Sequence, residues 1–565
     1  MGGEKSKVET IKEQSGFLRG TIRETLGQDT DHFSNEDYQV LKFHGIYQQN
    51  DRDLKRQLKR QKEKRYIFMI RSKVPAGRLT AEQYLVHDWL ADRYANGTLR
   101  ITTRQDFQLH GVLKSGLEPT LRAINRALVT TLGACGDLER NVVSCPAPAP
   151  GGLRDELARH ARRISDHLLP RTRAYHEIWL DGEKVHTTQQ DIEPLYGPGY
   201  MPRKFKTGIG LPGDNCVDIF THDIGLLAFA EGNRLHGFNV LAGGGMGMTH
   251  GKEETYPRLA SPLAFVPAGE ILPVVEAILT IQRDHGNRAD RKTARLKYLL
   301  DAWGFPRFRE EVERRAGRKL AAPLALPIQD VHDHLGWSEE GGGRWYVGTP
   351  VENGRIKDES GPRLKGALRE VIGRYRPSVR LTPLQSILLC GIGEGDRAGV
   401  EAILRDHGVP SPGEISPARR WAMACPALPT CGLALTEAER VMPDLVKRLE
   451  DELHSIGLGN ERIVVHMTGC PNGCARPYSS EVGVVGRTAD TYNIYLGGGF
   501  EGTRLNHLYA EKVALDEIVP ALSPLLAGYA TNRRPGERFG DFCHRLGMEN
   551  LRRMSGAYRM TGVGC

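Results

Sequence analysis

The sequence predicts an α+β fold that is internally duplicated with pseudo-two-fold symmetry, with two small α+β units and two larger α/β units. Two observations lead to this prediction. Similar segments recur in the same order in the two halves of the 565-residue chain. Between them, short stretches with strand-like alternation are interleaved with amphipathic helical patterns, of which residues 155–169 are an example. A chain of this length can bury more than one core.

The duplication rests on three pairs of aligned segments. Two pairs keep an offset of 280 residues and the third has an offset of 254, so the second copy is shorter between its second and third aligned segments. The pairs are 100–112 with 380–392, 140–147 with 420–427, and 238–245 with 492–499. A chain duplicated in this way is expected to fold with approximate internal two-fold symmetry around a central cofactor site.

The two copies differ in the polarity of their first aligned segment. Read as a strand, the first copy places the following residues on one face: Arg100, Thr102, Arg104, Asp106, Gln108 and His110. The same positions of the second copy hold Arg380, Thr382, Leu384, Ser386, Leu388 and Cys390. A polar, cationic face has thus become largely apolar. We therefore expect the first copy to bind an anion-rich ligand through this face.

Four cysteines near the C-terminus, Cys425, Cys431, Cys470 and Cys474, have the spacing C-x5-C followed by C-x3-C. Thiolates in fours bind a tetrahedral zinc ion or an iron–sulfur cluster. The x5 segment holds two prolines and is wider than a zinc knuckle, so the spacing favours a cluster and leaves zinc as the alternative. Ten cysteines in a chain of this length are ordinary intracellular usage, which disfavours disulfides.

Three other cysteines, Cys135, Cys216 and Cys543, are interpreted as buried residues without a ligand role. Residues 436–439 resemble a capping box that opens a helix ending near residue 456, whose N-terminus would help to stabilise an anionic centre. The glycine triplets at 243–245 and 497–499 lack the G-x-G-x-x-G pattern of a dinucleotide site. No nicotinamide or flavin site is evident, so a redox centre in this chain is expected to receive electrons from a separate protein.

Charged residues also alternate in two other predicted strands. They are Arg71 and Lys73 in residues 66–74, and Lys204 and Lys206, opposite Arg203, in residues 202–207. Taken alone, such charges are typical of solvated strand edges. The charged stretch 282–297 is consistent with either a solvated helix face or further contacts to an anionic ligand.

Six segments, in order along the chain, carry a resemblance to a known family. They are FHGIYQQNDRD (43–53), TTRQDFQLHG (102–111), RNVVSC (140–145), PRKFKT (202–207), NVLAGGGMG (239–247) and the cysteine segments that end in TGCPNGCARP. Together they make the chain similar to the sulfite and nitrite reductase hemoproteins, which carry siroheme coupled to a [4Fe–4S] cluster. The likeness is greatest to assimilatory sulfite reductases, both the ferredoxin-dependent type and the hemoprotein beta subunit of the NADPH-dependent type.

The resemblance implies roles for residues at matching positions. The substrate anion would be held by Arg71, Arg140, Lys204 and Lys206. The cluster would be held by the cysteine quartet, with Cys474 bridging it to the siroheme iron. Siroheme carries many carboxylates and would suit the polar face of the first copy, so the residues expected to bind it are Arg100, Arg104, Gln108, His110 and Arg203. Asn472, between two of the cluster cysteines, would form a hydrogen bond to cluster sulfur and tune the reduction potential.

The implied reaction is the six-electron reduction of sulfite to sulfide. Positive charge on the substrate oxygens lowers the cost of binding a small dianion and polarises each S–O bond as it breaks, and lysines can also donate protons. Reduction of nitrite to ammonia is the alternative, because it takes six electrons at the same type of site. From a different class, a non-catalytic scaffold that binds zinc is the second alternative. The sequence leaves open the oligomeric state and the lysine that donates protons.

The net charge of +8 and the pI near 8.9 are consistent with docking of an acidic electron carrier, either a ferredoxin or an NADPH-dependent flavoprotein subunit. The basic run 55–65 is interpreted as a solvated helix or wrapping extension, with carrier docking and, more weakly, nucleic-acid binding as alternatives. No apolar run approaches the length of a membrane span, so we expect a soluble, cytoplasmic enzyme without membrane contact.

The expected domain boundaries follow the repeat. Residues 1–60 are expected to form a partly helical N-terminal extension that wraps the body. The ferredoxin-like half-domains are expected at 61–130 and 340–412, and the larger reductase domains at 131–330, with the anion-binding side, and 413–565, with the cluster. Residues 321–327 and 340–343 are expected to be linkers between the halves.

Overall fold

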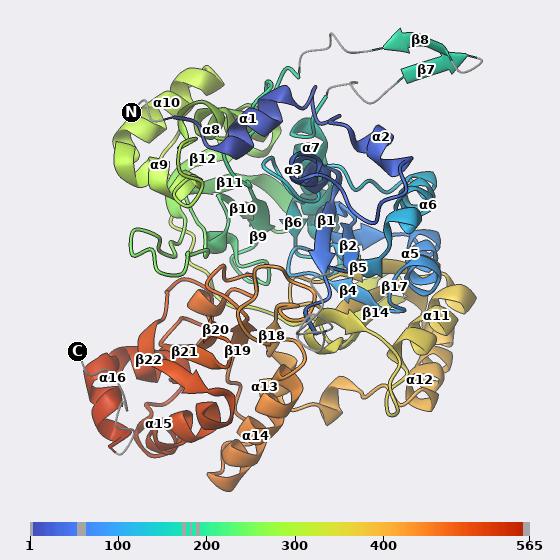
Figure 1. Ribbon diagram of the computed structural model, residues 1–565. Helices are drawn as coiled ribbons and strands as arrows, with labels where there is room; N and C mark the ends of the chain where they lie inside the picture. The colour runs from blue at the N-terminus through green and yellow to red at the C-terminus, as the bar shows by residue number, and fades with distance from the viewer. Residues whose placement is uncertain (1–3, 54–63, 172–176, 181–182, 188–192, 557–565) are drawn as a thin grey trace. The chain divides into compact units, whose positions relative to one another are not determined.

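Figure 1 shows the computed structural model, which describes residues 4–53, 64–171, 177–180, 183–187 and 193–556. The chain forms two compact units. Unit 1 comprises residues 1–245, 260–327 and 334–409, and unit 2 comprises residues 246–259, 328–333 and 410–565. Most of the basic run 55–65 lies outside the described residues, so its interpretation stays a prediction.

Unit 1 contains two small sheets built on the same plan. The first copy supplies β1 (Ile46–Asn50), β2 (Tyr66–Arg71), β3 (Arg78–Leu79), β4 (Leu99–Ile101) and β5 (Phe107–Val112). The second copy supplies β13 (Gly336–Gly341), β14 (Arg344–Thr349), β15 (Arg355–Ile356), β16 (Ser378–Leu381) and β17 (Ile387–Gly393). The strand orders are β1-β2-β5-β4-β15 and β13-β14-β17-β16-β3. Each copy therefore gives its short third strand to the sheet of the other copy, and this reciprocal exchange confirms the duplication.

The helices of the small sheets also correspond. They are α5 (Ala81–Tyr94) and α6 (Lys114–Arg126) in the first copy, and α11 (Leu364–Tyr375) and α12 (Arg397–Asp406) in the second. Helix α5 begins with a capping box, because Thr80 Oγ1 accepts from Gln83 N at 3.2 Å and Gln83 Oε1 accepts from Thr80 N at 3.0 Å. Apolar residues of both copies, Leu90 and Leu368 among them, belong to one buried cluster.

The segment from Arg100 to His110 forms a hairpin and not the single strand expected from its alternation. Strands β4 and β5 are joined by a turn over residues 102–106, in which Thr102 N donates to Asp106 O at 2.9 Å. Gln105 in this turn has a φ of 58°. The prediction of one continuous face was wrong, because alternation alone cannot distinguish an extended strand from two strands joined by a tight turn.

Each unit also contains one larger sheet, and the two larger sheets share one plan. In unit 1 the strands are β6 (Val143–Ser144), β9 (Thr207–Gly210), β10 (Ile224–Glu231), β11 (Arg234–Ala242) and β12 (Ser261–Pro267). In unit 2 they are β18 (Met423–Ala424), β19 (Val465–Thr468), β20 (Val482–Thr488), β21 (Thr491–Leu496) and β22 (His507–Ala514). In both sheets the first three strands are parallel and the last two pairings are antiparallel (Figure 1). The predicted duplicated α+β class is therefore confirmed.

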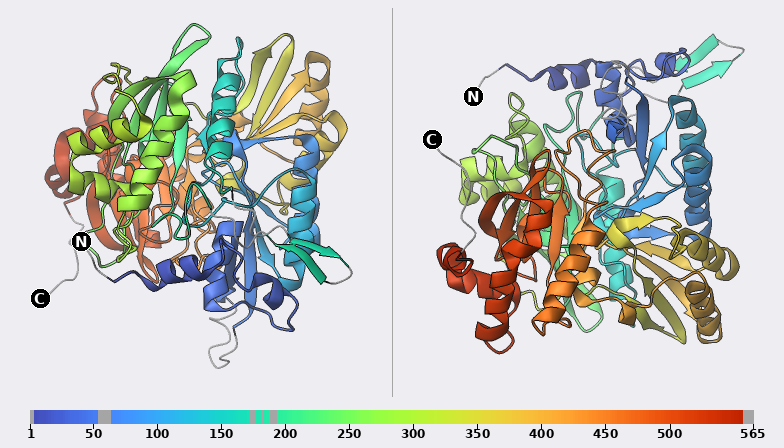
Figure 2. Two further views of the ribbon diagram at one scale, coloured as in Figure 1. Left: turned by 90° about the horizontal axis from the view of Figure 1, so that it is seen from above. Right: turned by 60° about the horizontal axis from the view of Figure 1, so that its bottom comes forward.

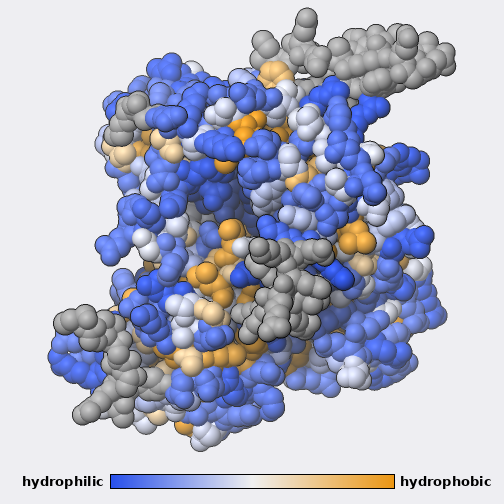
Figure 3. All heavy atoms as spheres, viewed as in Figure 1, coloured by the Kyte–Doolittle hydropathy of each residue, from blue (hydrophilic) through white to orange (hydrophobic). Residues whose placement is uncertain are grey.

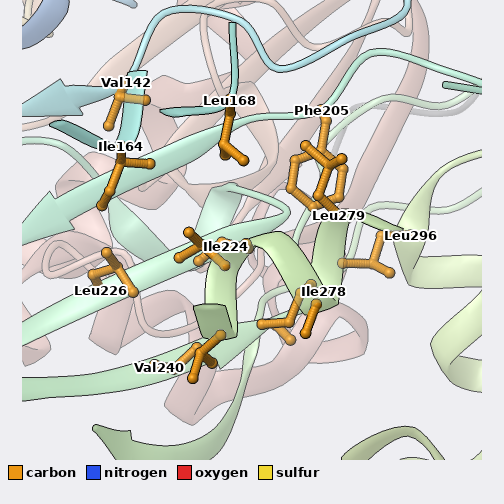
Figure 4. Packing of buried hydrophobic residues seen from close by; sticks show 14 of the residues in the cluster. Val142, Ile164, Leu168, Phe205, Ile224, Leu226, Val240, Ile278, Leu279 and Leu296 are labelled. Atoms are coloured by element: carbon orange, nitrogen blue, oxygen red, sulfur yellow. The ribbon is translucent and has the colours of Figure 1, made fainter. Parts of the chain in front are cut away.

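Helices cover the larger sheets. In unit 1, α8 (Ile271–His285) packs against α10 (Phe305–Ala316), and Figure 2 shows both beside the green strands of the sheet. Figure 4 shows part of the core between α8 and the sheet, where Ile278 of α8 lies on the side of Ile224 and Val240 and Leu279 of α8 lies beside Phe205. Each such side chain contributes about 1.5–3 kcal/mol when fully buried, which holds the strand ends near the site in place.

The remaining elements lie outside these sheets. They are α1 (Lys7–Gln14), α2 (Ile22–Leu26), α3 (Asn35–Leu41), α7 (Leu153–His167), the hairpin β7 (Glu177–Leu180) and β8 (Glu183–Thr187), α9 (Leu296–Trp303), α13 (Pro417–Arg420), α14 (Met442–Ser455), α15 (Ile518–Asn532) and α16 (Phe539–Met554).

The glycine-rich residues 340–343 form the turn of the β13–β14 hairpin and not a linker, because their positive-φ glycines reverse the chain.

Charged and polar residues predominate on the face shown in Figure 3, in agreement with a chain that is 26% charged. Among the residues that the structure describes, none of the helices combines the length and the apolar character that crossing a membrane requires.

Candidate active site

A row of polar side chains crosses the first small sheet. Arg71, at the end of β2, lies opposite Gln108 in β5. Gln108 in turn lies opposite Arg100 in β4, and Arg100 lies opposite Arg355 in β15. Directly paired residues of antiparallel strands project to the same face, so three guanidinium groups and one amide share a face. When the Gln108 amide oxygen is turned toward Arg71, it accepts from Arg71 Nη2 at 2.5 Å.

His110 follows Gln108 by two residues on β5 and therefore projects to the same face. Burial and the charges of Arg355, Arg100 and Arg71 hold the pKa of His110 well below its usual value, so the imidazole is neutral. Its Nδ1 atom is buried and has no hydrogen-bond partner among the described residues. A ligand with several carboxylates would balance the charge of the guanidinium groups and pair with this nitrogen.

A second group of cations lies beside the larger sheet of the same unit. Glu139 is bridged to Phe205 in parallel orientation, and Arg140 N donates to Phe205 O at 3.1 Å. Glu139 and Phe205 are fully buried, and Arg140, Lys204 and Lys206 are their neighbours in the two bridged segments. Three of the four predicted substrate-binding residues therefore lie in one cation-rich strip of the unit, which these two segments form.

Tyr47 in β1 connects the two groups of cations. Burial raises the pKa of its phenol, and the positive charges of Arg140, Arg71 and Arg203 oppose this rise. These three arginines therefore lie within electrostatic range of one side chain. Arg140 is also fixed in place, because its Nη2 donates to a backbone carbonyl at 3.1 Å. Sequence reasoning gave Tyr47 no role, since a tyrosine in a strand is ordinarily a packing residue.

Two of the predicted cofactor-binding arginines have different surroundings. Arg104 lies in the β4–β5 turn and is buried, with its terminal nitrogens against His222 Nδ1, at 3.0 Å, and Asn141 O. These contacts account for its burial, and its part in cofactor binding stays a prediction. Arg203 is half-buried, and burial, together with neighbouring arginines, lowers the pKa of its guanidinium to about 10.

The charged stretch 282–297 forms the end of α8, a loop and the start of α9. Arg291 pairs with Asp137 at 2.6 Å, and Arg295 makes a bidentate pair with Asp223 at 3.1 and 2.7 Å. The interpretation as a solvated helix face was wrong, because these ion pairs fix the loop to the unit. Contact of this stretch with an anionic ligand stays a prediction.

Three buried titratable side chains, Lys73, Asp106 and Glu139, lie among the cations. Burial raises the pKa of Asp106 to about 7, raises the pKa of Glu139 and lowers the pKa of Lys73. Lys73 Nζ is buried without a hydrogen-bond partner among the described residues. Groups with such shifted pKa values can hold and release protons near neutrality. Sequence analysis placed Lys73 and Asp106 on polar faces but did not predict their burial, because the depth at which residues beside short strands lie is not visible in the sequence pattern.

Unit 2 places the four cysteines at one edge of its sheet. Strands β18 and β19 are parallel, Cys425 directly follows β18, and Cys470 follows β19 by two residues. Both thiols therefore lie at the carboxyl ends of neighbouring strands. Cys431 lies in the loop after Cys425, where its N donates to Ala427 O at 2.8 Å. Cys474 lies in the turn after Cys470 and is exposed.

Two glycines allow these loops to approach each other. A Cβ atom at Gly469 would lie 2.6 Å from Ala427 Cβ and 2.6 Å from Thr436 O. Gly473 has a φ of 63°, and a Cβ atom there would lie 3.2 Å from Met246 O. A side chain at Gly469 would push the two cysteine loops apart, and one at Gly473 would meet Tyr478 and Met246, so both positions require glycine.

The four thiols of the quartet lie within electrostatic range of one another. Burial raises the pKa of Cys425 well above its usual value, and the other three cysteines of the quartet contribute to the rise. Four such thiols offer one ligand to each iron of a [4Fe–4S] cluster.

Two N–H groups are directed at these sulfurs. Asn472 Nδ2 donates to Cys470 Sγ at 3.4 Å, and Gly469 N donates to Cys425 Sγ at 3.4 Å. Such bonds stabilise negative charge on a cluster and raise its potential. The predicted capping box at 436–439 was wrong, because α14 begins only at Met442 and the Thr436 hydroxyl donates to Glu437 O at 3.1 Å.

These two donor sets fit the groups that the sequence suggested. The thiol quartet offers four ligands to iron, and the orphaned His110 Nδ1 on a guanidinium-rich face suits a macrocycle that carries carboxylates. A duplicated α+β chain with these sets defines a class of redox protein that holds an iron–sulfur cluster and an anionic cofactor.

Comparison with protein families agrees with this class. The model of the nitrite and sulphite reductase 4Fe-4S domain matches residues 160–320 and 416–559. The model of the nitrite/sulfite reductase ferredoxin-like half domain matches residues 59–127 and 338–407. The chain therefore belongs to the nitrite and sulphite reductase family, and membership implies siroheme and a [4Fe–4S] cluster as its cofactors.

Individual relatives cover nearly the whole chain. A "Sulfite reductase [ferredoxin]" of Synechococcus elongatus is 46% identical over 98% of this chain and 91% of that protein. A "Sulfite reductase [NADPH] hemoprotein beta-component" of Geobacillus thermodenitrificans is 47% identical over 97% of this chain and 96% of that protein. The solved structure of the Mycobacterium tuberculosis NirA protein, at 24% identity, covers 97% of this chain and 98% of its own with a TM-score of 0.78, and it supports the fold.

Proposed function

We propose that this chain is an assimilatory sulfite reductase hemoprotein, which reduces sulfite to sulfide with six electrons. The observation that carries the proposal is 46–47% identity, over nearly the whole chain, to proteins named sulfite reductase. The cation-rich strip of unit 1 supports it, because sulfite is a small dianion that requires positive charge around its oxygens. When bound, the siroheme supplies an iron that binds and reduces the substrate, and the cluster supplies electrons one at a time.

The chain's own residues bind and orient the substrate. Arg140 is held by its backbone contacts and offers a fixed guanidinium, while Lys204 and Lys206 present ammonium groups from the neighbouring segment. Arg71 completes the set from the small sheet. Together they would lower the cost of binding the dianion and withdraw electron density from each S–O bond as it breaks.

The cofactors would be held by the two donor sets already described. Arg100, Gln108 and His110 would bind carboxylates of the siroheme on the face of the small sheet, with Arg104 and Arg203 as further candidates. Cys425, Cys431, Cys470 and Cys474 would bind the cluster, and Cys474, the exposed member, would be the residue shared with the siroheme iron.

Protons are the second requirement of the reaction, since each oxygen leaves as water. Lys204 and Lys206 are placed to donate them to substrate oxygens. Behind them, Lys73, Asp106 and Glu139 form a buried set whose shifted pKa values suit proton storage. Burial around these groups excludes bulk water, so protons would reach the substrate through side chains.

Electrons would come from a separate donor protein. The names of the relatives include both a ferredoxin-linked and an NADPH-linked type. A chain with a net charge of +8 suits an acidic carrier of either kind. We therefore expect turnover with a reduced ferredoxin or with a flavoprotein subunit and NADPH to fall as salt rises. A cytoplasmic location stays a prediction.

The experiment compares sulfite with nitrite as substrates of the holoenzyme, with a reduced viologen as electron donor. The proposal predicts stoichiometric sulfide and a higher kcat/KM for sulfite than for nitrite. A higher kcat/KM for nitrite would instead assign the chain as a nitrite reductase. A preparation that contains both centres but forms no sulfide would refute the proposal.

A further inference from the structure

A second group of metal-type ligands lies in unit 1 and has no part in the site described above. Cys145, Asp214, Cys216 and His334 each place a donor atom within 4.8 Å of the others, and all four residues are buried. Cys145 Sγ lies 3.1 Å from Asp214 Oδ2 and 3.4 Å from His334 Nε2. His334 Nε2 lies 3.0 Å from the same Asp214 oxygen. The four donor atoms therefore already form one close group.

The fold explains why these residues meet. Strands β6 and β9 are parallel, Cys145 directly follows β6, and Asp214 and Cys216 lie in the loop after β9. Both loops therefore leave the sheet at the same edge. The fourth residue, His334, lies just before β13 and has a φ of 59°. A ligand that joins the four would tie the first-copy sheet to the start of the second copy.

The same edge carries the cysteine quartet in the larger sheet of unit 2. There Cys425 directly follows β18 and Cys470 follows β19, the strands that correspond to β6 and β9. The duplicated plan therefore provides metal-type donors at equivalent strand ends in both copies. In the first copy the donors lie within 4.8 Å of one another and include nitrogen and oxygen, which suits a single ion and not a cluster.

The distances fit a tetrahedral ion. Zn–S bonds of about 2.3 Å and Zn–N or Zn–O bonds of about 2.0–2.2 Å place neighbouring ligand atoms about 3.3–3.8 Å apart. The separations of 3.0–3.4 Å among Cys145, Asp214 and His334 need only a slight outward movement of these side chains, and the Cys216 thiol lies within 4.8 Å of them. Two thiolates, one imidazole and one carboxylate are also a donor set that zinc accepts.

Charge in the buried site is balanced with such an ion. Arg154 Nη1 donates to Cys145 Sγ at 3.0 Å, and Arg154 Nη2 lies 3.1 Å from Asp214 Oδ2. Two thiolates and one carboxylate carry three negative charges, which a divalent ion and one guanidinium neutralise. Arg154 is therefore a partner of the ligands in their deprotonated form, as outer residues of metal sites commonly are.

From this geometry we propose that Cys145, Cys216, His334 and Asp214 bind one structural zinc ion. Binding would replace the proton of the Cys216 thiol and the second proton of the His334 imidazole by the ion, so that no net charge enters the buried site. No electron transfer is involved. The site lacks an open position, because all four ligands come from the protein, and it would stabilise unit 1 without taking part in the reaction.

The test uses the holoenzyme as purified, with iron and zinc measured together. The proposal predicts one zinc per chain alongside a full complement of iron, and X-ray absorption at the zinc edge that shows two sulfur neighbours near 2.3 Å and two lighter neighbours near 2.0–2.1 Å. Cys216→Ser and His334→Gln should each lower the zinc content several-fold, while Cys543→Ser, a buried cysteine of α16, should not.

Three results would overturn the proposal. The first is a fully iron-loaded holoenzyme without zinc, which requires no variant and so does not depend on mutant folding. The second is a Cys145–Cys216 disulfide found by mass mapping of the purified protein. The third is bound zinc that both variants retain, which would place the ion elsewhere. None of these results depends on the proposed reaction, because zinc content is read without turnover.

Discussion

Replacing Asn472 by leucine tests the proposed tuning of the cluster. The Asn472 side chain is half-buried, and its Nδ2 donates to Cys470 Sγ at 3.4 Å. Leucine has a similar size but no donor, so the substitution removes one N–H···S bond while the backbone bond from Gly469 to Cys425 remains. The reduced cluster carries one more negative charge than the oxidised cluster and gains more from this bond. Its loss should therefore lower the reduction potential.

The magnitude follows from the energies of such bonds. A hydrogen bond to a charged group contributes about 1.5–3 kcal/mol, and the cluster is anionic in both redox states, so one added electron should strengthen the bond by a part of this energy, about 1 kcal/mol. For a one-electron couple, about 1.4 kcal/mol corresponds to about 59 mV. The expected fall is about 40 mV for Asn472→Leu. In Asn472→Asp, which adds a carboxylate as well, the reduction potential should fall further.

The assay is a redox titration of the holoenzyme followed by electron paramagnetic resonance of the reduced cluster. Iron and acid-labile sulfide contents show whether each variant is fully loaded. The matched control is Asn550→Leu on α16, whose amide donates to a backbone carbonyl and not to a cysteine. An unchanged or higher potential in fully loaded Asn472→Leu would refute the assigned role of this hydrogen bond.

Three further predictions concern other parts of the chain. Lys206→Met should lower kcat/KM for sulfite about 10- to 100-fold in steady-state assays, as expected for one charged hydrogen bond of about 1.5–3 kcal/mol, whereas Lys319→Met, at an exposed lysine, should not. Arg100→Leu should lower the siroheme content, read from the visible spectrum, and leave the iron content of the cluster unchanged. The control Arg122→Leu, at an exposed arginine, should keep a normal siroheme content. Equal siroheme contents in the two variants would contradict the role of Arg100 in binding carboxylates. Burial raises the pKa of Glu481 from 4.5 to about 7, so the folded state holds this proton more tightly and its stability should fall by about 3 kcal/mol as pH rises from 4.5 through 7. The stability measured by hydrogen exchange at Gly540, whose N donates to Glu481, should fall with rising pH in the wild type and fall less in Glu481→Gln. An equal fall in both proteins would be the contrary result.

Much of the fold could be predicted from sequence because the duplication leaves direct traces. The offset of 280 residues between Arg100 and Arg380 reappears as the correspondence of β4 and β5 with β16 and β17, and the offset between 140–147 and 420–427 reappears as β6 and β18. The exchange of β3 and β15 between copies could not be predicted, since two-residue strands carry no alternation that distinguishes a partner.

In the candidate site as well, contacts that depend on how strands pair could not be predicted from the sequence. Cys425, Cys431, Cys470 and Cys474 could be predicted as ligands from their spacing, because thiol ligands must be cysteines at loop distances that close around a metal. The placement of Arg104 could not be predicted, because the β4–β5 turn moves it away from Arg100 and Gln108 and against His222. Cys216 was interpreted as an apolar core cysteine, yet it lies beside Cys145, Asp214 and His334. Those residues are far apart in sequence, and only the strand pairing brings them together.

The central claim is that one chain holds a siroheme and a [4Fe–4S] cluster and uses them to reduce sulfite. The most direct measurement is the visible spectrum of the protein expressed with siroheme synthesis enabled, combined with iron and acid-labile sulfide analysis and repeated after addition of sulfite to the reduced enzyme. The claim predicts a siroheme spectrum that sulfite perturbs, with about five iron atoms and about four labile sulfides per chain. A protein without a visible band, whose cysteine quartet binds zinc, would contradict it.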